Sequence, residues 1–127
     1  MKVFVYFNLH KKCFSIKALE GQFKGLVIGH TNSVLLSDVS FKVSQAGRSR
    51  VLAEKRKNVH AGVCGTWEDG IYDHVTVERS SLLGQAVAYN PYKYDSFVVR
   101  STEQPIKQSR VVALSVTNQR ASIYSLS

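Results

Sequence analysis

The sequence predicts an α+β fold: a mostly antiparallel sheet of short strands with one main helix, at about residues 45–57. Short runs rich in valine and aromatic residues recur along the chain, and turn-forming residues separate them. Only one stretch has the composition expected inside a helix. The 127 residues suit a single domain, residues 1–127, with one hydrophobic core.

The first third of the chain predicts four strands, at residues 2–9, 13–19, 26–30 and 33–43. The polar stretch "HKK" between the first two favours an antiparallel hairpin, with Asn8 and His10 at its tip. Two glycines form a turn before the third strand. In the fourth strand the apolar residues alternate most regularly in the second half.

The predicted helix begins after Ser44, whose hydroxyl can accept hydrogen bonds from the first free backbone N–H groups. Its residues, "QAGRSRVLAEKRK", include Ala, Leu, Glu, Lys and Arg, which are good helix formers. Gly47 and Val51 belong to a narrow apolar seam that cations flank. The segment 55–57 is predicted as the last turn, where three cations suit the negative end of the helix dipole.

The second half of the chain is less regular. Residues 59–67 predict a strand, residues 68–74 an acidic turn, and the next stretch is ambiguous. Asn90 and Pro91 form a turn between two apolar stretches, and tyrosines crowd around it. The closing residues "RVVALSVT", "NQ" and "RASIYSL" predict a hairpin.

Charge and cysteine content restrict the classes of partner. The formal net charge is +8 and the isoelectric point is near 9.7, so an anionic partner is favoured: nucleic acid, a nucleotide or an anionic surface. Two cysteines, Cys13 and Cys64, do not form a disulfide framework, and no apolar run is long enough to span a membrane. We therefore expect a reduced protein of the cytoplasm that does not bind a membrane.

Signatures of catalysis and metal binding are weak. No phosphate-binding glycine loop is present. His60, Cys64 and His74 lack a fourth ligand for structural zinc, and a cysteine in a strand is more often buried than nucleophilic. "HVT" at His74 matches one copy of the His-x-Thr unit that phosphoesterases use twice. We predict no metal and no cofactor, and a phosphoesterase that degrades a signalling molecule stays an alternative.

Two kinds of anion binding remain. Residues 42–57 hold six cations against one acid, which favours nucleic acid, although no nucleic-acid-binding motif accompanies them. A small nucleotide needs an aromatic face, a few cations and some amides. The turn "YNPYKYDSF" and the cluster Arg56, Lys57, Asn58 and His60 supply all three.

Three stretches, "VFVYFNLHKKCFSI", "FKVSQAGRSRVLAEKRKNVHAG" and "AYNPYKYDSFV", resemble the first family of bacteriophage Thoeris anti-defence proteins. The resemblance covers about residues 1–65 and 88–99, and "KRKNVHAG" is its most specific part. It implies a sponge: a homo-oligomer, dimeric or larger, that binds cyclic ADP-ribose isomers made by TIR-domain enzymes in the host cytoplasm without cleaving them. Some members also bind cyclic oligonucleotides, and no catalytic residue is implied.

The resemblance also suggests site residues. Phe97 is the candidate ring against the adenine, and Phe97→Ala is expected to weaken binding while the fold stays intact. Arg56 is the candidate cation for the pyrophosphate. The remaining candidates are Tyr92, Asn90, Asn58 and His60 within the similar stretches, and Arg110 and Arg120, which lie outside them and are chosen by residue type alone. Leu26 and Phe7 stand where related sequences carry arginine.

Overall fold

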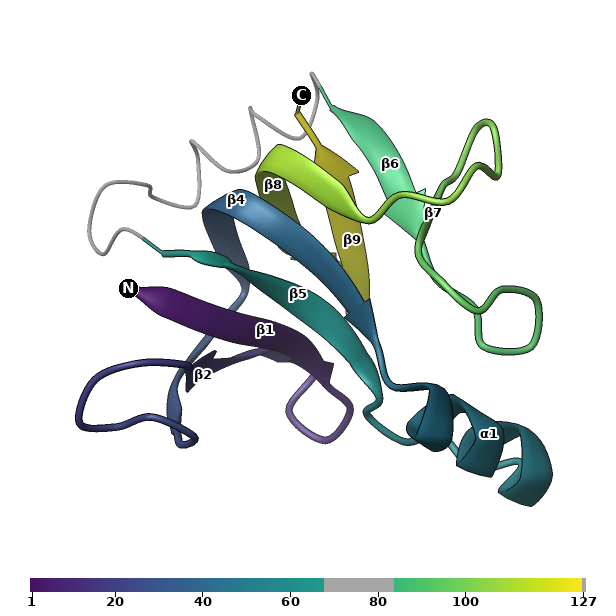
Figure 1. Cartoon of the computed structure of the whole chain (residues 1–127), viewed down its shortest axis with the longest axis horizontal. Helices are drawn as coiled ribbons and strands as arrows, with labels where there is room; N and C mark the ends of the chain where they lie inside the picture. Colours follow the sequence, from purple (N-terminus) through teal and green to yellow (C-terminus); the bar gives the residue numbers. More distant parts are fainter. Residues whose placement is uncertain (68–83, 127) are drawn as a thin grey trace.

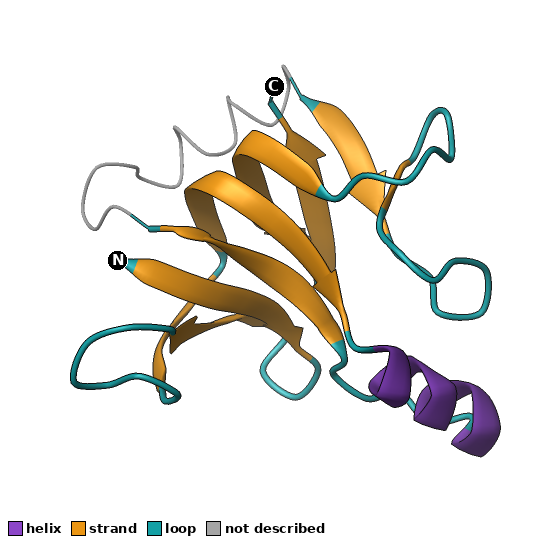
Figure 2. Ribbon diagram, viewed as in Figure 1, coloured by secondary structure: helices purple, strands orange, loops and turns teal. Residues whose placement is uncertain are grey.

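The computed structural model describes residues 1–67 and 84–126, which form a strongly curved antiparallel sheet with one helix at its end (Figures 1 and 2). The strands are β1 (Lys2–Asn8), β2 (Cys13–Ala18), β3 (Val27–Thr31), β4 (Ser33–Val43), β5 (Ala61–Thr66), β6 (Gln85–Ala88), β7 (Val98–Val99), β8 (Gln108–Thr117) and β9 (Arg120–Ser125), and the helix is α1 (Gln45–Glu54). Their order in the sheet is β3-β2-β1-β5-β4-β8-β9-β6-β7. The predicted α+β fold is confirmed.

The two predicted hairpins are present. In the first, the side-chain oxygen of Asn8 accepts hydrogen bonds from the backbone N–H groups of His10 and Lys11, each at 3.0 Å, and so shapes the turn between β1 and β2. In the second, Asn118 and Gln119 both have positive φ, 52° and 63°, between β8 and β9. Positive φ at both central residues is the geometry of a two-residue hairpin turn.

Strand β4 is the longest, with 11 residues, and the sheet curves about it (Figure 1). It pairs with β8 along one edge and β5 along the other. The register with β5 shifts between Ser37 and Ser40, where Asp38 has a φ of 50°. Such a bulge bends the strand and increases its twist. The bend contributes to the curvature of the sheet seen in Figure 1.

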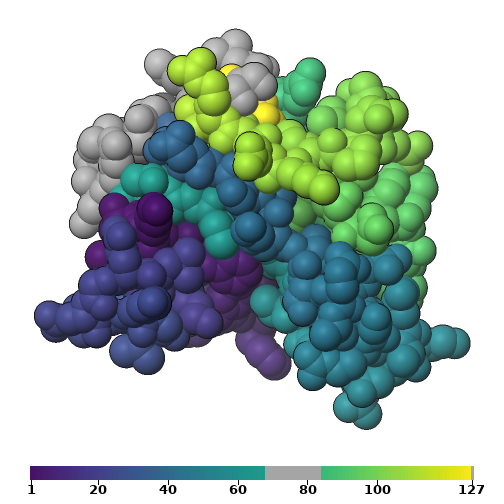
Figure 3. All heavy atoms as spheres, in the orientation of Figure 1, coloured from purple at the N-terminus to yellow at the C-terminus, as the bar shows by residue number. Residues whose placement is uncertain are grey.

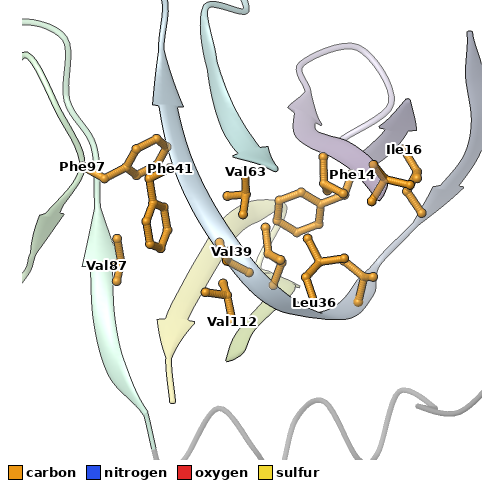
Figure 4. Close-up of a cluster of buried hydrophobic side chains, with 13 residues drawn as sticks. Phe14, Ile16, Leu36, Val39, Phe41, Val63, Val87, Phe97 and Val112 are labelled. Carbon is orange, nitrogen blue, oxygen red and sulfur yellow. The ribbon is translucent and has the colours of Figure 1, made fainter. Parts of the chain in front are cut away.

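The main core lies on the inner face of this curved sheet (Figure 4). Its buried side chains alternate along the strands, as residues of one sheet face must. They are Val3, Val5, Phe14, Ile16, Val34, Leu36, Val39, Phe41, Val63, Val87, Phe97, Val112 and Leu114. Burial of each such side chain contributes about 1.5–3 kcal/mol.

Helix α1 ends three residues earlier than predicted. Ser44 caps its start as expected, because its hydroxyl accepts from the backbone N–H of Gly47 at 3.2 Å. At the other end Lys55 has a φ of 56°, a left-handed conformation that stops the helix after Glu54. Lys55, Arg56 and Lys57 therefore belong to the exposed segment that leads to β5. The prediction that they form the last helical turn was wrong.

Residues 68–83 and 127 lie outside the described part of the chain, so the predicted acidic turn at 68–74, the ambiguous stretch after it and His74 have no structural account here. Within the described ranges, no helix is long and apolar enough to cross a membrane.

Candidate ligand pocket

A cavity of about 590 Å³ is lined by residues of β1, β5, β6 and β9, which are not all neighbours in the curved sheet. Strands β1 and β5 supply one wall, and β6 and β9 supply the opposite one. The segment before β5 and the turn at 90–92 complete it. Strands distant in the sheet order therefore meet at one cavity because the sheet is curved.

Tyr89 and Phe97 line this cavity as part of an aromatic row that continues into the core at Phe41. Tyr89 packs on Phe97 with ring centroids 5.2 Å apart, and Phe97 packs on Phe41 at 5.1 Å. Phe97 is only 5% exposed, so it belongs to the core as much as to the cavity. Tyr92 also lines the cavity and is 61% exposed. Tyr92 thus offers a free ring face, whereas Phe97 is largely covered.

His60 joins the segment before β5 to this aromatic row. Its Nδ1 lies 2.8 Å from the backbone oxygen of Asn58, and its Nε2 lies 2.6 Å from the hydroxyl of Tyr89. Helix α1 approaches closely behind it, since a Cβ at Gly47 would lie 2.5 Å from the Cβ of His60. A glycine is therefore required at position 47 for this approach.

The turn that carries Tyr92 is tied to helix α1 by three hydrogen bonds. Nε of Arg48 donates to the backbone oxygens of Pro91, at 3.1 Å, and Tyr94, at 3.0 Å. Nε2 of Gln45 donates to the backbone oxygen of Asp95 at 2.9 Å. In Figure 3 the helix and the segment around residues 90–100 adjoin on one flank of the molecule.

On the side away from helix α1, the turn that carries Tyr92 contacts the carboxylate of Glu103. Glu103 accepts a hydrogen bond from the Tyr94 hydroxyl and pairs with Lys93, whose Nζ lies 2.7 Å from its carboxylate. Hydrogen bonds from Lys93 and Tyr94 lower the pKa of Glu103, so this acceptor is ionised at neutral pH. The turn therefore has hydrogen bonds to helix α1 on one side and to Glu103 on the other.

Two cations lie at the cavity, Lys57 from the segment before β5 and Arg100 from the residues after β7. Both side chains are exposed, and neither is in an ion pair with an acid of the described residues. Phe7 also lines the cavity, where its ring packs edge-on against Phe14 with centroids 5.7 Å apart. The two cations therefore lie at the exposed rim of the cavity, whereas the residues deeper in it, such as Phe7 and Phe14, are apolar.

The structure brings together five of the eight candidate residues: Asn58, His60, Asn90, Tyr92 and Phe97 all line the cavity. Arg56, Arg110 and Arg120 do not line it. Arg110 instead lines a separate depression with Asp38 at the bulge of β4, and Arg120 begins β9. The roles of all eight in binding stay predictions.

Tyr89 and Arg100 are cavity residues that were not among the candidates. The backbone N–H of Arg100 donates to the oxygen of Ala86 at 2.8 Å, which places it beside β6. No sequence pattern marks this pairing, because β7 has only two residues. The tyrosine cluster is visible in the sequence, yet nothing there shows which of its members His60 contacts.

Cys64 lies half-buried in β5 and does not have the properties of an activated nucleophile. Burial raises the pKa of its thiol, and the charge of Lys42 opposes this only in part. A raised pKa reduces the thiolate fraction at neutral pH. Within the described ranges, no three side chains of the His, Cys, Asp and Glu types lie close enough together to hold a metal ion.

Comparison with known proteins places the chain among phage proteins. The family described as "Mycobacterium phage L5 gene 82 protein" matches residues 1–122. The "Gene 82 protein" of Mycobacterium phage L5 is 39% identical over 127 residues, and the match covers 95% of each chain. No solved structure matches.

Proposed function

The chain belongs to the phage family of the Mycobacterium phage L5 gene 82 protein, and we propose that it acts as a phage accessory protein. In this proposal, which rests on the chemistry of the cavity, it sequesters a cyclic nucleotide signal of host immunity. The proposed ligands are cyclic ADP-ribose isomers, with cyclic oligonucleotides as a second class. The protein would hold the signal intact, which is the activity that its sequence resemblance to the Thoeris anti-defence proteins implies.

The observation that carries this proposal is the chemistry of the cavity. Its volume of about 590 Å³ falls within the range of small-molecule sites. Tyr92 offers an exposed ring for a base, and Asn58 and Asn90 offer amides for a sugar. Lys57 and Arg100 offer charge for a pyrophosphate. These groups match the three parts of a nucleotide.

The required affinity is attainable with these groups. A sponge competes with the effector for each signal molecule, so a dissociation constant of micromolar or lower is needed, about −8 kcal/mol. Stacking of one base contributes about 1–3 kcal/mol, and a hydrogen bond to a charged group about 1.5–3 kcal/mol. The fixed turn at 90–95 supports tight binding, because a preordered site loses less entropy when the ligand binds.

An oligomer is part of the proposal. The cavity lies at the surface of a small chain, and a second copy that packs over its rim would exclude water and strengthen the charge interactions. Arg56, Arg110 and Arg120, which do not line the cavity, would contact ligand only from such a neighbouring copy.

The net charge of +8 favours nucleic acid as the second candidate partner. Calorimetric titration with cyclic ADP-ribose isomers and with duplex and single-stranded DNA separates the two functions. The sponge predicts saturable binding of the small ligand, with a modest salt dependence. A nucleic-acid binder instead gives affinity that grows with strand length and falls steeply with salt, and this result would overturn the proposal.

A further inference from the structure

His60 is held in one tautomer by the contacts of its two ring nitrogens. Nδ1 lies 2.8 Å from the backbone oxygen of Asn58, and a carbonyl oxygen can only accept, so Nδ1 carries the proton. In a neutral imidazole Nε2 is then an acceptor. Because Nε2 lies 2.6 Å from the Tyr89 hydroxyl, that hydroxyl donates its single proton to His60.

To a ligand group that reaches it, the Tyr89 hydroxyl is therefore an acceptor. Its proton is committed to His60, and its oxygen has no other hydrogen-bond partner among residues 1–67 and 84–126. Burial raises the pKa of Tyr89, with a smaller increase from Asp95 and a partial decrease from Arg48, so the hydroxyl stays protonated near neutral pH. Tyr89 lines the cavity, where its lone pairs are the free part of the group.

An acceptor discriminates between the groups of a nucleotide. Phosphate oxygens can only accept hydrogen bonds, so they are disfavoured beside another acceptor. Ribose hydroxyls can donate or accept, so the Tyr89 oxygen neither selects nor excludes them. The exocyclic amino group of adenine only donates. Tyr92, with its exposed ring, lines the same cavity and offers a face for that base.

We propose that Tyr89 recognises the exocyclic amino group of an adenine base, and that His60 is the positioning residue that fixes Tyr89 as an acceptor. This inference rests on the proposed function, since it names the base that the sequestered signal carries. In this arrangement Lys57 and Arg100, at the rim of the cavity, bind the phosphates. The pocket would then reject hypoxanthine, in which a carbonyl oxygen replaces the amino group.

The test is calorimetric titration at pH 8 with a cyclic ADP-ribose isomer whose adenine N1 is unsubstituted, so that position 6 carries an amino group, and with the hypoxanthine counterpart of that isomer. We expect the wild-type protein to bind the adenine form about five- to tenfold more tightly, the effect of one matched hydrogen bond. Tyr89→Phe, which removes one oxygen atom, should reduce this ratio to about one.

Variants of His60 separate positioning from general structural damage. His60→Leu should also reduce the ratio to about one, because Tyr89 is then free to donate or accept. His60→Gln should keep the preference, since its amide oxygen can accept from Tyr89 in place of Nε2. His30→Leu is the matched control, because His30 lies on β3 and does not line the cavity.

A nitrogen-15 NMR spectrum of the imidazole rings gives a second readout without ligand. The inference predicts a protonated Nδ1 for His60, whose signals are identified by their loss in His60→Gln and change in Tyr89→Phe. An Nε2-protonated His60, or equal binding of the two probes by the wild-type protein, would overturn the inference alone. Failure of the wild-type protein to bind either probe would contradict the proposed function and this inference with it.

Discussion

Arg48 and Tyr94 lie 46 positions apart, yet Nε of Arg48 donates to the backbone oxygen of Tyr94 at 3.0 Å. The same Nε also reaches the backbone oxygen of Pro91. Helix α1 thereby holds the turn that carries Tyr92 at the edge of the cavity. The shape of the pocket depends on this contact between helix and turn.

Replacement of Arg48 by methionine tests that dependence. The loss of its hydrogen bonds should lower the free energy of unfolding by about 1–2 kcal/mol, measured by urea denaturation. Affinity for cyclic ADP-ribose should fall several-fold, because the turn becomes less ordered before binding. Gln45→Ala, which removes one bond to the same segment, should have a smaller effect on both. Unchanged affinity in Arg48→Met would show that the turn does not shape the site.

Tyr92 and Phe97 are expected to respond differently to replacement by alanine. Tyr92→Ala should leave the stability within about 0.5 kcal/mol, since the ring is exposed, and should weaken ligand binding about tenfold. Phe97→Ala should lower the free energy of unfolding by about 3–5 kcal/mol, because the ring is buried between Phe41 and Tyr89. The burial thus argues against the sequence-based expectation of an intact fold. A stable Phe97→Ala variant would contradict this account of the core.

The cations at the rim should contribute through charge. Lys57→Gln and Arg100→Gln are each expected to weaken binding several-fold and to reduce its dependence on salt concentration, measured by calorimetry at two ionic strengths. Lys24→Gln, in an exposed turn away from the cavity, is the matched control.

The Arg56→Gln variant tests whether Arg56, a site residue predicted from the sequence, binds the ligand although it lies outside the cavity. The measurement is ligand affinity by calorimetry. Arg56 does not line the cavity. If one copy of the chain forms the whole binding site, this variant should therefore change the affinity for the ligand little. An effect as large as that of Lys57→Gln would mean that a neighbouring copy completes the site.

The thiol of Cys64 should alkylate slowly. Burial raises its pKa, so at pH 8 the folded protein has a smaller thiolate fraction than the unfolded chain. In a Cys13→Ser variant, which leaves one thiol, iodoacetamide should react more slowly in buffer than in urea, and the rate should keep rising as the pH increases above 8. Equal rates in the folded and unfolded states would contradict the assignment of Cys64 as a half-buried, structural cysteine.

Local patterns in the sequence predicted most of the sheet. The two-residue turn at Asn118 and Gln119 is visible in the sequence because polar residues interrupt two apolar runs there. The end of helix α1 was not predictable in this way. Lys55 is a good helix former, and only the return of the chain to β5 beside β4 requires its left-handed conformation.

The site was predictable in its residue types but not in its arrangement. The tyrosine turn and the cluster Asn58–His60 stand out in the sequence, and both line the cavity. The hydrogen bond between His60 and Tyr89 depends on the curvature of the whole sheet, which no local pattern encodes. Arg56, chosen from the family resemblance, and Arg110 and Arg120, chosen by residue type alone, do not line the cavity.

The central claim is that the protein binds a cyclic nucleotide signal and leaves it intact. The most direct measurement incubates the purified protein with cyclic ADP-ribose isomers and cyclic oligonucleotides, removes it by filtration, and identifies by mass spectrometry what heat denaturation releases. The account predicts depletion of a signal from the filtrate and its recovery, unchanged, from the denatured protein. Altered products would instead indicate an enzyme, and no depletion of any signal would contradict the proposed function.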